Sequence, residues 1–134
     1  MPDRTTTDLR PLVWVAAASG VYDVALGLVL LFGRPLLQQL FALPAPLPPI
    51  HADLNALFCI AIGIGYALPY RQPREYRAYL WVMGPFLKGV GSAGFLVDHF
   101  VRHSPPAFLI FSLTDGILAA AALWALLATP RSRS

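Results

Sequence analysis

Three ionisable side chains stand inside apolar stretches of this sequence, and they are the residues most able to do chemistry. Lys88 lies in the stretch GPFLKGVGSAGFLVDHF, with no acidic residue closer than ten positions along the chain. Asp23 and Asp115 stand in two other apolar stretches. A lysine between two aspartates can lock helices in register. Alternatively, it can leave one carboxylate without its own cation, free to take up a proton or to bind a cationic group.

A second set of polar residues lies near one end of the apolar stretches. We expect these residues to form a polar layer on the outer side of the membrane: His51, Asp53, Asp98, His99 and His103. Two histidines four residues apart, as His99 and His103 are, can share a metal ion. Pro105 follows closely, however, and it limits the helix that would hold them. We therefore expect neither a metal nor a haem here.

The motifs of the common enzyme classes are missing from the sequence. It has no HExxH, no nucleophile elbow and no phosphate-binding glycine loop on a strand. The single Cys59 excludes an internal disulfide, a CxxC redox pair and a thiolate zinc site. The sequence therefore favours a protein without enzymatic activity, and we assign no catalytic residue, metal ligand or cofactor.

The composition indicates a membrane protein. Apolar residues make up 57% of the 134 residues and charged ones only 13%, whereas ordinary soluble domains are about a quarter charged. A single domain of this length cannot hide so much apolar surface in a core. The net charge of +3 does not predict nucleic-acid binding, because the basic residues stand in the gaps between apolar runs. The expected partner is the lipid bilayer.

Four apolar runs are long enough to cross a bilayer, which needs about 20 residues per helix. They cover about residues 12–32, 52–69, 79–101 and 107–127. The first run is longer than the core of a signal peptide and follows two acidic residues, so we expect it to be retained. The sequence predicts an all-α integral membrane protein, an up-down four-helix bundle with residues 1–134 as one domain.

The loop between the first two runs, residues 33–51, has a pattern of its own. Apolar residues recur at helical spacing behind Pro35, a favoured first-turn residue, at Leu36, Leu37, Leu40 and Phe41. The loop can therefore hold a short helix lying on the membrane surface, or it can be a plain loop.

The arginines predict the orientation. With four spans, one side of the membrane receives Arg4, Arg10, Arg71, Arg74, Arg77, Arg131 and Arg133, and the other side receives Arg34 and Arg102. Because basic residues favour the cytoplasmic side, both termini are expected in the cytoplasm of a bacterium, with the chain in its inner membrane.

The depth of the three charges can be counted along the helices. At 1.5 Å per residue, Lys88, Asp23 and Asp115 lie about 13, 16 and 18 Å from the inner surface. Each shares a helical face with small residues, which let membrane helices approach closely. We therefore expect Lys88 to lie between Asp23 and Asp115 in a buried polar centre, with Asn55 from the second span.

Four short motifs follow one another through the last two-thirds of the chain: Gly63-Ile64-Gly65-Tyr66, Pro73-Arg74, Gly84-Pro85-Phe86-Leu87-Lys88 and Thr114-Asp115. In this order they resemble a group of small bacterial four-span proteins, and the layout is similar to the DoxX-like membrane proteins. The resemblance implies a four-span fold and a membrane location, and some DoxX-like proteins accompany redox enzymes. Gly-Pro stands before the lysine where the resemblance implies Gly-Leu, which predicts a kink at Pro85.

Two functions from different classes fit these observations. The first is an accessory subunit that packs against a larger membrane complex or against copies of itself. The second is a ligand-binding or proton-coupled transport protein, whose centre is reached from the outer side past His51, Asn55 and His99. A dry, packed centre would favour the first function, and a wet cavity joining the centre to the outer face would favour the second.

Overall fold

The computed structural model describes residues 8–129, and all regular structure in that range is helical. The expected all-α fold is confirmed. Four helical rods are long and apolar enough to cross a membrane: Arg10–Phe32, Pro49–Arg71, Arg77–Arg102 and Pro106–Ala128. These features indicate a multi-pass membrane protein. The predicted ends of the spans differ from these by at most three residues, at the start of the second rod.

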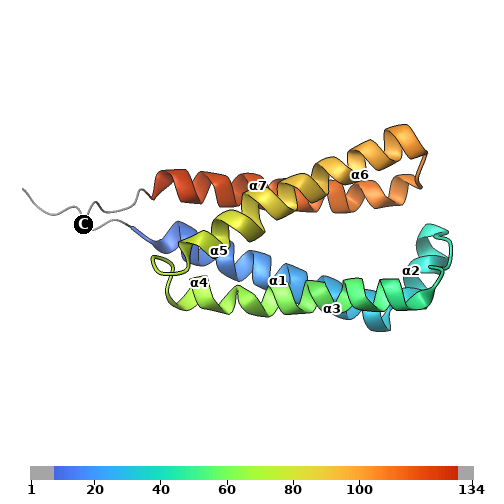
Figure 1. The fold of residues 1–134 in the computed structure, drawn as a ribbon, viewed down its shortest axis with the longest axis horizontal. Coiled ribbons are helices and arrows are strands. Elements are labelled where there is room, and N and C mark those ends of the chain that lie inside the picture. Colours follow the sequence, from blue (N-terminus) through green and yellow to red (C-terminus); the bar gives the residue numbers. More distant parts are fainter. Residues whose placement is uncertain (1–7, 130–134) are drawn as a thin grey trace, which may run out of the picture.

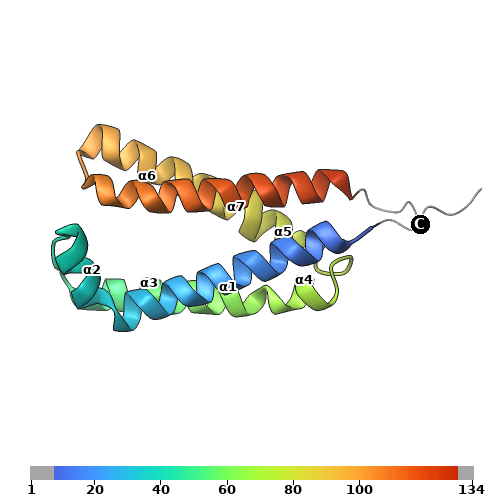
Figure 2. The ribbon, with the colours of Figure 1, turned by 180° about the vertical axis from the view of Figure 1, so that it is seen from behind.

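The four rods form two antiparallel pairs (Figure 1). The first pair is α1 (Arg10–Phe32) with α3 (Pro49–Gly65) and its continuation α4 (Ala67–Arg71). The second pair is α7 (Leu109–Ala128), preceded by the short helix η2 (Pro106–Phe108), with the rod made of α5 (Arg77–Trp81), η1 (Val82–Lys88) and α6 (Gly89–Arg102). The first residues of α1 and the last residues of α7 lie at the same end of the bundle (Figure 2).

Glycines bring α1 and α3 into direct backbone contact. A Cβ atom added to Gly63 would lie 2.7 Å from the backbone nitrogen of Val24 and 2.8 Å from the carbonyl oxygen of Gly20. A Cβ atom added to Gly27 would lie 2.6 Å from the carbonyl oxygen of Ala56. Small residues at these positions are therefore what allows the two helices to pack at this distance.

The second rod is interrupted at Tyr66, where α3 passes into α4. Pro69 has no N–H to bond the carbonyl of Gly65, and α3 ends at that glycine. The hydroxyl of Tyr79, at the start of the third rod, donates to the carbonyl oxygen of Ile62 at 2.6 Å. A side chain at Gly65 would collide with that hydroxyl. This contact ties the two helix pairs together.

The third rod changes from α-helix to π-helix at Val82–Lys88, around Pro85. Proline cannot donate the i→i−4 hydrogen bond, and a π-helical segment is one way in which a helix accommodates it. The predicted irregularity at Pro85 thus takes the form of a π-helix that ends at Lys88.

Packing is dense at one end of the bundle and open at the other. The dense core lies at the end where α1 begins and α7 ends, and it consists of Leu12, Val15, Ala16, Tyr66, Leu80, Ala122, Ala125 and Leu126. Toward the opposite end the two helix pairs diverge (Figures 1 and 2). The outward surfaces carry large apolar side chains such as Trp14, Phe58 and Phe86, as expected of a surface that meets lipid.

The loop between the first two spans contains a helix, α2 (Arg34–Phe41), that lies across the open end of the α1/α3 pair (Figure 1). Of the two alternatives for this loop, the structure therefore has the short helix. Leu36 and Leu40 are exposed, and Arg34 forms an ion pair with Asp53 of α3.

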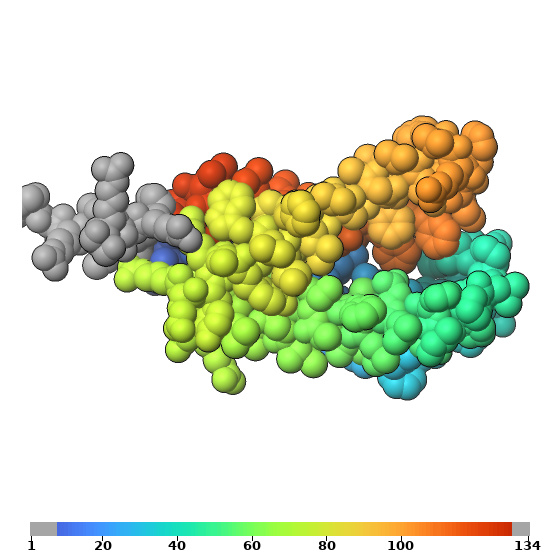
Figure 3. Space-filling view, in the orientation of Figure 1, coloured from blue at the N-terminus to red at the C-terminus, as the bar shows by residue number. Residues whose placement is uncertain are grey.

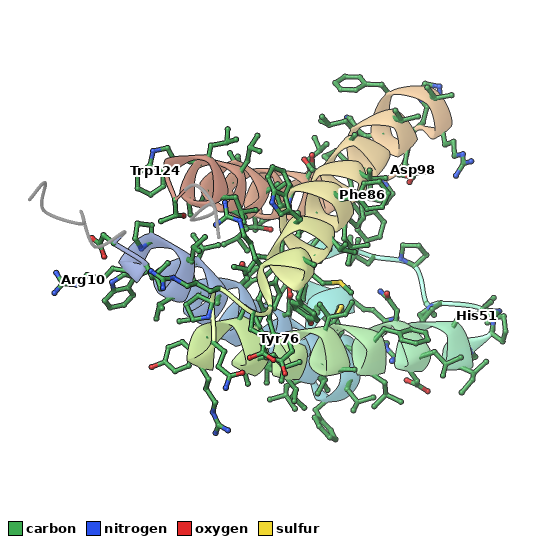
Figure 4. The ribbon with its side chains drawn as sticks, turned by 60° about the vertical axis from the view of Figure 1, so that its left-hand side comes forward. Arg10, His51, Tyr76, Phe86, Asp98 and Trp124 are labelled. Carbon is green, nitrogen blue, oxygen red and sulfur yellow. The ribbon has the colours of Figure 1, made fainter. Side chains whose placement is uncertain are left out.

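The described arginines lie at the two ends of the bundle. Arg10 at the start of α1 (labelled in Figure 4), Arg71, Arg74 and Arg77 lie at the dense end, and Arg34 and Arg102 lie at the open end. Arg4, Arg131 and Arg133, on which the predicted orientation also depends, lie outside the described residues.

Candidate functional site

Three helices each bring one charged side chain to the middle of the bundle. The Nζ atom of Lys88, at the end of η1, lies 2.5 Å from Oδ1 of Asp23 on α1 and 3.6 Å from Oδ1 of Asp115 on α7. Lys88 and Asp23 are almost completely buried, with 6% and 7% of their side chains exposed, whereas Asp115 is 20% exposed. The structure thus brings together the three charges that were expected to meet.

The lysine has an aromatic neighbour as well. Its Nζ atom lies 5.1 Å from the centroid of the Tyr22 ring, within the range of a cation–π contact. The Tyr22 hydroxyl lies 2.6 Å from the Thr114 hydroxyl, so the ring is held against α7. Nothing in the sequence pattern singled out Tyr22, because its contact with Lys88 joins helices far apart in the chain.

The charges of the centre do not balance. Two carboxylates and one ammonium leave one surplus negative charge when all three are ionised. Lys88 forms its hydrogen bond with Asp23 and only the longer ion pair with Asp115. Coulomb attraction weakens with distance, so the surplus negative charge resides mainly on Asp115.

A serine pair holds α6 and α7 in register beside the centre. The Ser92 hydroxyl donates to the carbonyl oxygen of Ser112 at 2.7 Å, and the Ser112 hydroxyl donates to the carbonyl oxygen of Ser92 at 2.8 Å. Ser92 follows Lys88 by one turn, and Ser112 precedes Asp115 by about one turn. The pair therefore positions Asp115 relative to the lysine.

A cavity of about 270 Å³ lies between the two helix pairs and reaches Asp115. Its apolar wall contains Phe95 of α6, Phe108 of η2 and Phe111 of α7. The ring of Phe95 lies 6.5 Å from that of Phe108 and 5.5 Å from that of Phe111, between centroids. Leu26 and Leu30 of α1 line the opposite side. The space-filling view shows the molecule hollowed between these helix pairs toward the open end (Figure 3).

The polar groups of the cavity are few. Besides Asp115, the wall contains Cys59 and Asn55, which are one turn apart on α3. Asn55 was expected in the buried centre, but its side chain is exposed in the structure. The reason is the divergence of the helix pairs, which leaves this turn of α3 without a neighbour close enough to bury it.

On the opposite side of the lysine the centre is closed. Three side-chain oxygen atoms are buried here: Ser19 Oγ, Asp23 Oδ2 and Tyr66 Oη. The dense core, which includes Tyr66, packs against this side. Asp23 therefore belongs to the closed half of the bundle and Asp115 to the open half.

The expected outer polar layer is divided in the structure. His51 is exposed at the start of α3, well separated from Asp98 on α6 (Figure 4). Asp53 pairs with Arg34. His51 and Asp53 therefore lie on the first helix pair, and Asp98, His99 and His103 lie on the second. The two pairs diverge at this end.

The α6 members of that layer stabilise the end of their own helix. Asp98 accepts hydrogen bonds from Arg102 and Ser104, and Nδ1 of His99 lies 2.8 Å from the carbonyl oxygen of Ser104. His103 is exposed, with a left-handed backbone (φ 56°) that ends α6. Within residues 8–129, no three His, Cys, Asp or Glu side chains are grouped as a metal site.

The three phenylalanines of the cavity wall, Phe95, Phe108 and Phe111, were not predicted from the sequence to belong to a site. A signal was present, because Phe108, Phe111 and Asp115 are spaced three and four residues apart and such residues share one face of a helix. That the face borders a cavity depends on the distance between the helix pairs, which no spacing along the chain reveals.

No known protein family matches this chain, and neither do the curated proteins or the solved structures. The resemblance to DoxX-like proteins thus receives no support from these comparisons.

Proposed function

We propose that this chain is a four-span protein of a bacterial inner membrane, with both termini in the cytoplasm, which binds a small amphipathic molecule between its helix pairs. The apolar outer surface supports insertion in a bilayer. The arginines at the dense end support a cytoplasmic position for that end. The two arginines at the open end are each paired with an aspartate, Arg34 with Asp53 and Arg102 with Asp98.

The observation that carries the binding proposal is the cavity whose wall includes Asp115. Ligand sites are typically concave and mostly apolar, with a few polar groups that orient the ligand. The cavity has this composition, with phenylalanines, leucines and one carboxylate among the residues that line it. A partly exposed carboxylate deep in a membrane protein also favours function over packing alone.

The role of an accessory subunit is the second candidate, and a different surface supports it. A groove of about 340 Å³ follows the outside of the α1 contact with α3 and α4. Gly20 and Gly63 lie at its base, and Ala16 and Ala17 lie beside them. Small residues of this kind let a further transmembrane helix approach closely.

The only cysteine of the chain, Cys59, tests the binding proposal directly because it lines the cavity. Thiosulfonate reagents react with thiolates, which form where water reaches the sulfur. We expect a membrane-impermeant thiosulfonate added to the outer face of intact spheroplasts to modify Cys59. The Cys59→Ala variant should remain unlabelled.

A matched control distinguishes the cavity from the general membrane surface. Phe58 is adjacent in sequence but points outward, with 64% of the residue exposed. The double variant Phe58→Cys, Cys59→Ala should react much more slowly, because its thiol faces lipid. If Cys59 reacts only after the membrane is dissolved, or no faster than this control, the binding proposal is wrong.

A further inference from the structure

We infer that the molecule bound in the cavity carries a protonated amine, and that this amine pairs with Asp115. The inference rests on the proposed binding function and specifies the chemical class of the ligand: an amphipathic primary amine with an aromatic or apolar body. Four observations carry it, namely the position of Lys88, the exposure of Asp115, the charge balance of the centre and the phenylalanine wall.

Lys88 pairs mainly with Asp23 and not with Asp115. Its Nζ atom is 2.5 Å from Asp23 and 3.6 Å from Asp115, and its side chain is buried on the side where the core packs. Asp115 is the more exposed carboxylate, and it is the one that borders the cavity. A group that enters the cavity therefore meets a carboxylate that Lys88 only partly neutralises.

The net negative charge of Asp23, Lys88 and Asp115 favours a cationic ligand. One added positive charge makes the centre neutral, with two carboxylates facing two ammonium groups. An anion would be repelled by the surplus negative charge of the same carboxylates. A neutral group would leave that charge unpaired in a medium of low dielectric constant, which is costly unless Asp115 takes up a proton.

The rest of the wall fits the body of such a ligand. Phe95 and Phe111 face the cavity with their centroids 5.5 Å apart, so they can pack against an apolar or aromatic group. Aromatic faces also attract cations. The side chain of Asn55 is exposed at the wall, and its carbonyl oxygen can accept a second hydrogen bond from an ammonium group.

The experiment compares three probes that share a phenylethyl group and differ in charge: 2-phenylethylamine, 2-phenylethanol and 3-phenylpropanoate. Each is tested, in detergent-solubilised full-length protein, for its ability to slow the modification of Cys59. Because hydrogen bonds to charged groups are the stronger ones, the amine should protect Cys59 at about tenfold lower concentration than the alcohol. The carboxylate should protect least.

The variant Asp115→Asn tests the assigned residue. It should remove the advantage of the amine over the alcohol, so that the two probes protect Cys59 at similar concentrations. A second measurement needs no variant: the wild-type Cys59 should react faster with a trimethylammonium-ethyl thiosulfonate than with a sulfonato-ethyl thiosulfonate, after each rate is normalised to a free thiol. We expect a preference for the cation of about tenfold.

The outcomes separate this inference from the proposed function. If the alcohol or the carboxylate protects as well as the amine, or the anionic reagent reacts as fast as the cationic one, the cavity binds ligands but the amine assignment is wrong. If Cys59 is modified readily and none of the three probes slows it, the amine assignment is again wrong. If Cys59 is not modified in the folded protein at all, the proposed function fails first.

Discussion

Ser92 and Ser112 exchange hydrogen bonds across the contact between α6 and α7, each hydroxyl donating to the backbone carbonyl of the other residue, at 2.7 and 2.8 Å. Such a reciprocal pair permits a single register of the two helices. Since Ser92 lies one turn beyond Lys88 and Ser112 about one turn before Asp115, this register also sets the distance between the lysine and the exposed carboxylate.

The double variant Ser92→Ala, Ser112→Ala should lower the free energy of unfolding by about 1–2 kcal/mol, because interhelical hydrogen bonds in membranes contribute about 0.6 kcal/mol each on average. Unfolding in detergent measures the loss. If the two single variants each cost as much as the double variant, the bonds act as a unit. If the double variant costs nothing, the register is determined by packing.

Replacing Lys88 by methionine should leave two carboxylates in the middle of the bundle without their cation. Breaking a buried pair by removal of one partner typically costs about 3–5 kcal/mol. The triple variant Asp23→Asn, Lys88→Met, Asp115→Asn removes all three charges and should recover much of that stability. Thermal unfolding in detergent compares the two, and a triple variant less stable than Lys88→Met would show that the charges stabilise the fold by themselves.

The two aspartates should differ when each is replaced by asparagine. Asp23→Asn replaces the charged partner at 2.5 Å and leaves the buried lysine with only the longer ion pair to Asp115, so it should be the more destabilising change. Asp115→Asn leaves the Lys88–Asp23 pair intact and charge-balanced, so its cost should be smaller by about 1–2 kcal/mol. Equal costs in the same unfolding measurement would contradict the asymmetry of the centre.

Glycine-to-alanine changes test the contact between α1 and α3. A methyl group at Gly27 would lie 2.6 Å from the carbonyl oxygen of Ala56. Gly27→Ala should therefore force the helices apart and cost about 1–3 kcal/mol. Gly94 is the matched control, because a methyl group there meets nothing within 4 Å. Gly94→Ala should be neutral or should stabilise by about 0.5–1 kcal/mol, and a destabilised Gly94→Ala would place that face of α6 against a partner.

Arg77 is a structural residue as well as one of the charges at the dense end of the bundle. Its buried side chain donates to the carbonyl oxygen of Leu126, in the last turn of α7, where helix carbonyls lack intrahelical partners. Arg77→Gln should therefore cost about 2 kcal/mol, whereas Arg74→Gln, at an exposed position, should cost little. Unfolding of both variants measures these costs. If Arg77→Gln leaves the free energy of unfolding unchanged, Arg77 does not stabilise the fold and contributes only its charge to the membrane topology.

The proposed orientation predicts the result of a fusion experiment. A reporter that is active only outside the cytoplasm, fused after residue 134, should remain inactive in the host bacterium. The same reporter fused in the outer loop after Phe41 should be active, since α2 lies at the opposite end of the bundle. The reverse pattern would show that the membrane topology is the opposite of the one proposed, and that the cavity opens toward the cytoplasm.

The sequence by itself determined the four helices long enough to span a membrane and the positions of the three buried charges along them. Both are quantities along one helix axis: a bilayer without water forces each crossing segment to be a helix, and each residue then adds a known rise. The faces of Asp23 and Lys88 could be assigned in the same way, because small residues recur beside them at helical spacing.

Only the tertiary structure decided which aspartate the lysine bonds, which carboxylate remains open, and that phenylalanines line the approach to it. The residues of the expected polar layer lie on two different helix pairs, and Asn55 lies in the cavity wall rather than in the buried centre. Both differences from the prediction follow from the divergence of the helix pairs. These outcomes depend on the distances between helices. Glycine contacts and the dense core pull one end of the bundle together, the π-helix at Pro85 shifts the course of the third rod, and the other end diverges. Residue spacing along a single helix carries no information about that divergence.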